Sequence, residues 1–244
     1  MNKTKIEWCD STLNPVVGCT FNCTYCYARR LNNRFKYIED WNKPQFFPER
    51  LKQLNSKKSK NIFMNSMSDI ADWKQSWITL TSIQMELNSQ HNYIFLTKRP
   101  KELIRRLPEF LGLLNRSNLW IGVSVTSEFE LSRISSLSTL KDYYELACNL
   151  FVSIEPIHGD VFEYYDVDPQ LDTPGQVLID FNWIIIGAET GNRVNKIKPN
   201  KKWIDRIVYI ARSWRHKVFM KDSLISIIGE ENMLRELPKE LVHK

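Results

Sequence analysis

The chain has 244 residues, of which 43% are hydrophobic, and a formal net charge of +6. This length suits one domain or one barrel, and the hydrophobic share is sufficient for a sizeable core. The longest apolar run is far shorter than the roughly 18 residues that span a bilayer, and the first residues lack the apolar segment of a secretory signal. We therefore expect no membrane protein. The number of cysteines is odd, five, which predicts no disulfide framework. We expect a single domain, residues 1–244, in a reducing, cytoplasmic compartment.

Short apolar runs alternate with amphipathic stretches along the chain. A short strand is predicted at residues 14–18, and a basic helix at 27–38. Runs such as the three isoleucines at 184–186 are apolar without alternation, as in strands that a parallel sheet buries on both faces. Further strands are predicted at 61–67, 93–97, 119–125, 150–154, 183–187 and 217–220, and further helices at 77–90, 101–115, 128–146 and 202–214.

Repeated β-α units with right-handed crossovers predict an α/β fold, either a doubly wound sheet or a barrel. Polar residues follow almost every predicted strand, where the catalytic groups of such barrels lie, and no G-x-G-x-x-G fingerprint is present. Both features favour the barrel. Residues 159–182 contain Asp-Pro and Thr-Pro-Gly and are predicted as a loop insertion, either a lid or a surface excursion without a role. Residues 223–244 are predicted as a helical extension of one or two short helices.

Three thiols lie close together in the N-terminal part of the chain. Cys19, Cys23 and Cys26 follow C-x3-C-x2-C spacing within eight residues. A structural zinc site has four protein ligands, and an ordinary electron-carrying cluster is held by four thiolates. No fourth ligand follows at close spacing, since the next cysteine is Cys148. A cluster on three thiolates would leave one iron open to a small molecule, which is the arrangement of a catalytic site.

This motif, with Tyr25 before its last cysteine, resembles the signature of the radical S-adenosylmethionine (SAM) enzymes. The wider pattern resembles a phage- and prophage-associated branch of that superfamily whose reaction is unassigned. It consists of KIEWCD (5–10), NSMSD (65–69), LTKRP (96–100) and SIEP (153–156), within a resemblance that runs from about residue 5 to residue 221.

The resemblance implies an incomplete (β/α)6 barrel of the TIM type, with an extra short strand at 217–220 and C-terminal helices. It also implies a [4Fe-4S] cluster on the three cysteines and SAM bound to the open iron. An electron from the cluster would cleave SAM to a 5'-deoxyadenosyl radical, which abstracts hydrogen from a substrate. An electron donor such as a flavodoxin or ferredoxin is the implied partner.

The predicted strand ends supply candidates for contacts to SAM. Its ammonium, carboxylate, ribose and adenine require carboxylate or carbonyl acceptors, a cation or hydroxyl, and an apolar slot. Glu155 is the expected contact of the ammonium or the ribose diol, and Lys98 the expected partner of the carboxylate. No catalytic residue can be named. The predicted cofactor-binding residues are Tyr25, Asn65, Ser66, Lys98, Ser124, Ser153, Glu155 and Glu189.

The sequence does not name a substrate, and the charge distribution is the available clue. Residues 193–202 hold five basic and no acidic residues, whereas residues 158–180 hold six acidic and no Lys or Arg. A basic segment attracts phosphates, although a solvated lysine-rich face is also common. We therefore expect a nucleic acid base or nucleotide as substrate, in modification or repair, with a peptide or a small metabolite next. The alternative class is a non-enzymatic nucleic-acid-binding module that contains zinc or a cluster.

Overall fold

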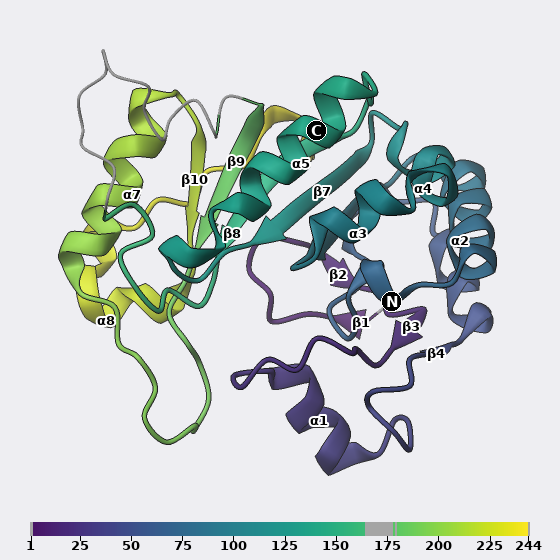
Figure 1. Ribbon diagram of the computed structural model, residues 1–244, viewed down its shortest axis with the longest axis horizontal. Helices are drawn as coiled ribbons and strands as arrows, with labels where there is room; N and C mark the ends of the chain where they lie inside the picture. The colour runs from purple at the N-terminus through teal and green to yellow at the C-terminus, as the bar shows by residue number, and fades with distance from the viewer. Residues whose placement is uncertain (1, 164–177, 179, 244) are drawn as a thin grey trace. The chain divides into compact units, whose positions relative to one another are not determined.

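A computed structural model describes residues 2–163, 178 and 180–243 (Figure 1). The protein has an α/β fold in which the strands of the main sheet follow the order β1-β2-β5-β6-β7-β8-β9-β10, and β3 and β4 form a separate pair. The chain divides into two compact units. The first comprises residues 1–121 with 146–149 and 243–244, and the second comprises 122–145 and 150–242. Within the described ranges, no helix is long and apolar enough to cross a membrane.

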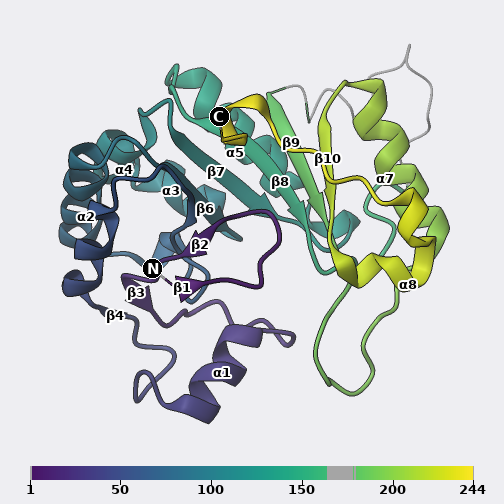
Figure 2. The ribbon, with the colours of Figure 1, turned by 180° about the vertical axis from the view of Figure 1, so that it is seen from behind.

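The first unit contains the short strands and the helix that follows the cysteine motif. Strand β5 pairs in parallel with both β2 and β6, while β1 pairs antiparallel with β2. Helices α2 and α4 lie side by side, as Figures 1 and 2 show from opposite sides. The bounds are β1 Asn2–Lys3, β2 Ser11–Thr12, β3 Val16–Val17, α1 Tyr27–Phe35, β4 Gln45–Phe46, β5 Asn61–Phe63, α2 Gln75–Leu87, β6 Asn92–Thr97, α3 Pro100–Arg105 and α4 Leu107–Leu114.

The second unit begins within β7 and contains a parallel pairing of β8, β9 and β10. The strand β9 is buried at Ile184, Ile185 and Ile186, as the unbroken apolar run predicts. Gly122 in β7 makes room for the next strand, since a Cβ there would lie 2.6 Å from the ring of Phe151. The bounds are β7 Leu119–Ser124, α5 Ser132–Tyr143, β8 Asn149–Ile154, β9 Phe181–Ile186, α7 Lys201–Ser213, β10 Lys217–Met220 and α8 Ile225–Ile228.

Most predicted elements are confirmed to within a few residues, and the extra strand at 217–220 is present as β10. The strand predicted at 14–18 is wrong in its role, because residues 16–17 pair antiparallel with β4 and it is β2 that lies beside β5. Pro15 has no N–H to donate to a ladder and separates the two short strands. The helix predicted at 101–115 is interrupted at Arg106, because a new helix begins at Leu107 with Pro108 in its first turn.

The ends of two further predictions also differ. The predicted strand 61–67 stops at Phe63, and the side chain of Asn65 continues the contact with β6. The C-terminal extension contains α8 and short 3-10 turns, and its residue Arg235 bridges antiparallel to Phe219 of β10. Most of the predicted insertion at 159–182 lies outside the described residues.

Candidate metal centre

The cysteine loop starts at Gly18, directly after β3. Gly18 has a φ of +110°, and a Cβ there would lie 2.8 Å from Pro44 Cα and 2.9 Å from the carbonyl oxygen of Trp41. The N–H of Gly18 donates to Met67 O at 3.0 Å, and the N–H of Cys19 donates to Trp41 O at 2.9 Å. Only glycine accepts both this φ and this close approach without strain. The loop is therefore pressed onto the segment around Trp41.

Cys19 and Cys26 pack against a small cluster of buried apolar residues. Its buried members are Val17, Ala28, Ile38, Trp41 and Met67. The cluster buries apolar groups from the cysteine motif and from residues 38–41, and so holds these two segments together.

Backbone N–H groups point at two of the three sulfurs. Phe21 N donates to Cys19 Sγ at 3.4 Å, and Arg29 N donates to Cys26 Sγ at 3.3 Å, which makes Cys26 the N-cap of α1. The guanidinium of Arg29 also donates to the carbonyl of Cys23 at 2.7 Å and braces the loop. N–H donors and a helix N-terminus favour a thiolate over a thiol. The loop is therefore suited to thiolate ligands.

Burial acts in the opposite direction on two of these thiols. It raises the pKa of Cys19, to which the carboxylate of Asp69 adds, while the N–H of Phe21 opposes the increase. Burial also raises the pKa of Cys23, and the ammonium of Lys98 opposes it. These two metal-free cysteines are consequently protonated at neutral pH, and a metal has to displace their protons on binding.

A carboxylate from the turn after β5 holds the loop from the other side. Asp72 accepts from Thr20 N at 2.9 Å and from the Thr20 hydroxyl at 2.7 Å. Arg99 lies 2.7 Å from Asp72 and donates to the Thr20 hydroxyl at 3.1 Å. This clamp of Thr20, Asp72 and Arg99 fixes the residue that follows Cys19. Sequence reasoning missed the clamp, because nothing in the local pattern links residues that lie so far apart in the chain.

The sequence-predicted residues of the first unit gather around this loop. The Lys98 ammonium lies 5.5 Å from the ring centroid of Tyr25, and its charge reaches Cys23, to which the Tyr25 side chain hydrogen-bonds. The Lys98 backbone N–H donates to Asp69 at 2.9 Å, which fixes the end of β6. A lysine cation therefore lies beside the cysteine motif.

Asn65 and Ser66 are tied into the protein frame. Asn65 is buried; its amide donates to Leu96 O at 2.6 Å and accepts from Leu96 N at 3.0 Å. The Ser66 hydroxyl bonds with the amide of Asn14, and its carbonyl accepts from the Tyr27 hydroxyl at 2.8 Å. Both residues thus brace the strand ends near the loop.

The remaining predicted residues belong to the second unit. Ser124 and Ser153 are buried, and the carbonyl of Ser153 accepts from Val125 N at 2.9 Å. Glu155 forms an ion pair of 2.5 Å with Lys221, which follows β10. A Cβ on Gly187 would lie 3.2 Å from Lys221 and 3.3 Å from Glu155, so the absence of a side chain there leaves room for this pair.

Glu189 is the centre of a charged cluster in the same unit. Its carboxylate is 3% exposed and accepts two bonds from Arg193, at 2.6 and 2.7 Å, while His158 Nε2 lies 3.2 Å away. Hydrogen bonding from Arg193 lowers the pKa of Glu189, against the effect of burial, and His158 assists. His158 was not among the predicted site residues, and Arg193 belongs to the basic segment 193–202, but its guanidinium is occupied by Glu189.

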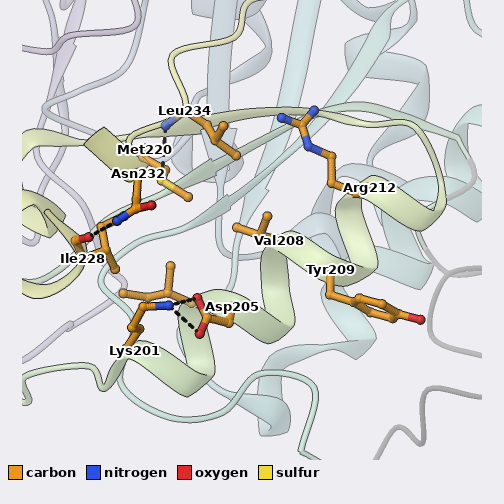
Figure 3. Close-up of a pocket in the computed structure, with 10 residues that line it drawn as sticks. Lys201, Asp205, Val208, Tyr209, Arg212, Met220, Ile228, Asn232 and Leu234 are labelled. Carbon is orange, nitrogen blue, oxygen red and sulfur yellow. Dashed lines mark hydrogen bonds and ion pairs between the residues drawn. The ribbon is translucent and has the colours of Figure 1, made fainter. Parts of the chain in front are cut away.

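A hollow of about 370 Å³ lies between α7 and the C-terminal tail (Figure 3). Its charged side chains are paired with their neighbours, Lys201 with Asp205 and Arg212 with Glu236. Tyr209 and Asn232 also line it, together with the apolar side chains of Ile204, Val208, Met220, Ile228 and Leu234. None of the predicted SAM contacts lines it, and we assign it no ligand.

Residues 3–223 match the model of a family described as "Protein of unknown function (DUF5131)". The chain belongs to the DUF5131 family. It is also similar to "Uncharacterized protein MJ0683" from Methanocaldococcus jannaschii, with 26% identity over 172 residues. That match covers 67% of this chain and 66% of the archaeal protein, a little less than two thirds of its length.

These findings correct the expected family. The assignment to the radical SAM superfamily, and to its phage-associated branch, is wrong, because the matching family is DUF5131. Moreover, in the part of the chain that the structure describes, no group of three or more His, Cys, Asp or Glu side chains is placed to hold a metal ion. The C-x3-C-x2-C spacing specifies how closely three thiols follow one another, but it specifies neither a family nor convergence of the thiols on one point.

Proposed function

We propose that Cys19, Cys23 and Cys26 bind a [4Fe-4S] cluster and that the protein is an enzyme that uses this cluster with SAM. The supporting observation is the loop itself. Three cysteines within eight residues are held by Gly18, by the N-terminus of α1 and by the clamp of Thr20, Asp72 and Arg99. The proposal rests on this donor set and not on membership of a family.

The chemistry of the donor set fits such a cluster. Thiolates are the usual ligands of iron–sulfur clusters. Cys19, Cys23 and Cys26 would hold the cluster through their thiolates. All five cysteines lie within the described residues, and none forms a disulfide. Two N–H donors directed at sulfurs would stabilise the thiolate form once the protons are displaced.

A bound cluster would supply the one electron needed to cleave SAM to methionine and a 5'-deoxyadenosyl radical, which would take hydrogen from the substrate. The protein's own residues would bind and orient SAM. Lys98 would hold the carboxylate of SAM, because the Lys98 ammonium lies beside Tyr25 and acts on Cys23. Glu155 remains our candidate for the ammonium or ribose contact, and its carboxylate pairs with Lys221 in the same unit.

The remaining expectations form part of the same proposal. The succession of parallel β-α units supports an incomplete (β/α)6 barrel of the TIM type. An electron donor such as a flavodoxin or ferredoxin is the proposed partner, in a reducing, cytoplasmic compartment. The proposed substrate is a nucleic acid base or nucleotide, supported by the basic residues of the chain.

The experiment is anaerobic purification followed by measurement of iron, sulfide and zinc. We expect brown protein that contains iron and sulfide and that, when reduced, converts SAM slowly to 5'-deoxyadenosine and methionine. Replacing all three motif cysteines with Ala should abolish iron binding, whereas the matched controls Cys9→Ala and Cys148→Ala should retain it. Colourless protein with about one zinc per chain would instead establish the non-enzymatic module. Loss of iron in either control would indicate a four-cysteine carrier.

A further inference from the structure

Helix α1 follows the cysteine loop in the same unit (Figure 1). One face of this helix combines exposed rings with cations that form no ion pair among the described residues. Tyr27, Leu31 and Phe35 are spaced four residues apart and so share one face of the helix. They are 46%, 37% and 51% exposed, and Tyr37 just beyond the helix is 47% exposed. Apolar groups of this size gathered on so short a stretch mark an interaction surface.

Positive charge is interleaved with these rings. Residues 27–37 contain four basic and no acidic residues. Arg29 is used to brace the cysteine loop, but Arg30, Arg34 and Lys36 are exposed. Within the described residues, no ion pair joins these three to an acidic group, whereas many other arginines, such as Arg99 and Arg212, have carboxylate partners. The face is therefore cationic without internal neutralisation.

The face is also held in a fixed shape. The amide of the buried Asn32 donates to Ile38 O and accepts from Ile38 N, both at 3.0 Å. With Lys36 at a φ of +53°, these bonds turn the chain so that the rings of Phe35 and Tyr37 come to 5.8 Å between centroids. The Arg34 guanidinium lies 4.9 Å from the Phe35 ring. Rigid rings lose little entropy when a ligand stacks on them.

We propose that this face, made of Tyr27, Arg30, Leu31, Arg34, Phe35, Lys36 and Tyr37, binds single-stranded nucleic acid. Unpaired bases stack on exposed rings, and phosphates pair with interleaved cations. A membrane surface is a poorer match, because a membrane-binding helix separates its apolar face from its basic one. An acidic protein would use the cations but has no particular need of open rings. The inference names the substrate class of the proposed enzyme and in that respect rests on the proposed function.

The test is fluorescence anisotropy with labelled single-stranded DNA and RNA, and with a duplex, on metal-free full-length protein. We expect tighter binding of single strands than of the duplex. Phe35→Ala combined with Tyr37→Ala should weaken binding about 5- to 150-fold, as expected for the loss of one stacked base. Arg30→Gln combined with Arg34→Gln should reduce the slope of log affinity against log salt by about 0.7 for each phosphate that the protein no longer neutralises.

Matched controls are available elsewhere on the surface. Phe129→Ala removes a ring that is 85% exposed, and Lys57→Gln with Lys58→Gln removes two exposed cations; neither should affect binding. No binding at low salt, an unchanged affinity in the ring variant, or an equal loss in the controls would overturn the inference. The same variants can be titrated with an acidic electron carrier and with anionic vesicles. If they lost binding to one of these ligands but kept their affinity for single strands, the inference would be overturned as well. The assay needs neither iron nor SAM, so its failure is distinct from failure of the proposed function.

Discussion

Asp72 accepts the backbone N–H of Thr20 at 2.9 Å, so a side chain 52 positions away fixes the residue next to Cys19. The same carboxylate accepts from the Thr20 hydroxyl and pairs with Arg99. Two functions are thereby joined in one group. Asp72 anchors the cysteine loop to the turn after β5, and it pairs with Arg99, which also lies 3.9 Å from Asp69.

Replacing Asp72 with Asn should loosen the loop. The variant loses the charge that strengthens the bonds from Thr20 and Arg99, and we expect a loss of about 1.5–3 kcal/mol in the free energy of unfolding. In metal-free protein, the thiol of Cys19 should react faster with a thiol reagent. Urea unfolding and the kinetics of thiol modification measure both effects. Asp40→Asn is the matched control, because the Asp40 side chain is exposed and accepts only from a nearby residue, the N–H of Asn42 at 2.9 Å, beside its ion pair with Lys43. Equal effects in the two variants would contradict the anchoring role.

The close approach at Gly18 predicts a sharp difference between two glycines. Gly18→Ala places a Cβ within 2.9 Å of two backbone atoms at a φ of +110°, so we expect a loss of stability of about 1–3 kcal/mol. Gly112→Ala meets only Ser82 Oγ, at 3.9 Å, within α4, and should be neutral or stabilise by up to about 1 kcal/mol. Thermal or urea unfolding of both variants is the measurement. A Gly18→Ala protein as stable as the wild type would show that the loop is not pressed onto the segment around Trp41.

The sequence was most informative where the signal was local. The three isoleucines of β9 predicted a buried strand, since no alternation was present. The strand β2 was missed, because Ser11 and Thr12 carry no apolar pattern and join the sheet through pairing with β1 and β5, which lie elsewhere in the chain. Long-range polar contacts, such as Glu189 with His158, have no local signature at all. Family membership also exceeded what a short motif can establish.

Two buried histidines predict that stability falls in mild acid. Burial lowers the pKa of His216 and of His91, against the effect of the carbonyls that each approaches. The folded state therefore binds fewer protons than the unfolded state, whose histidines have a pKa of 6.5. Stability is complete above that value and is lost as the pH falls through it, by at most about 1.4 kcal/mol per pH unit for each histidine. Urea unfolding at about pH 7.5 and about pH 5.5 should show the decrease.

The variant His216→Gln should flatten this dependence by up to half, because one of the two titrating groups is removed. It is expected to lower stability at the higher pH as well, since the site is tightly packed, but the comparison concerns the slope alone. A wild-type protein equally stable at both pH values would show that neither histidine is kept neutral by burial.

The basic segment at 193–202 should contribute fewer phosphate contacts than its charge suggests. Arg193 is bound by Glu189, Lys196 donates to Gly191 O at 2.6 Å, and Lys201 pairs with Asp205 at 2.7 Å. Lys198 and Lys202 are exposed and have no such carboxylate among the described residues.

If a single strand contacts this segment, Lys198→Gln with Lys202→Gln should lower the salt slope of binding by about 1.4, at about 0.7 per phosphate. Lys201→Gln should change it less, because the amine already has a counter-charge. Titrations of single-stranded DNA at several salt concentrations measure the slopes, and production of 5'-deoxyadenosine without substrate should be the same in all variants. An unchanged slope in the double variant would remove the segment from the nucleic-acid interface and leave the α1 face as the binding surface.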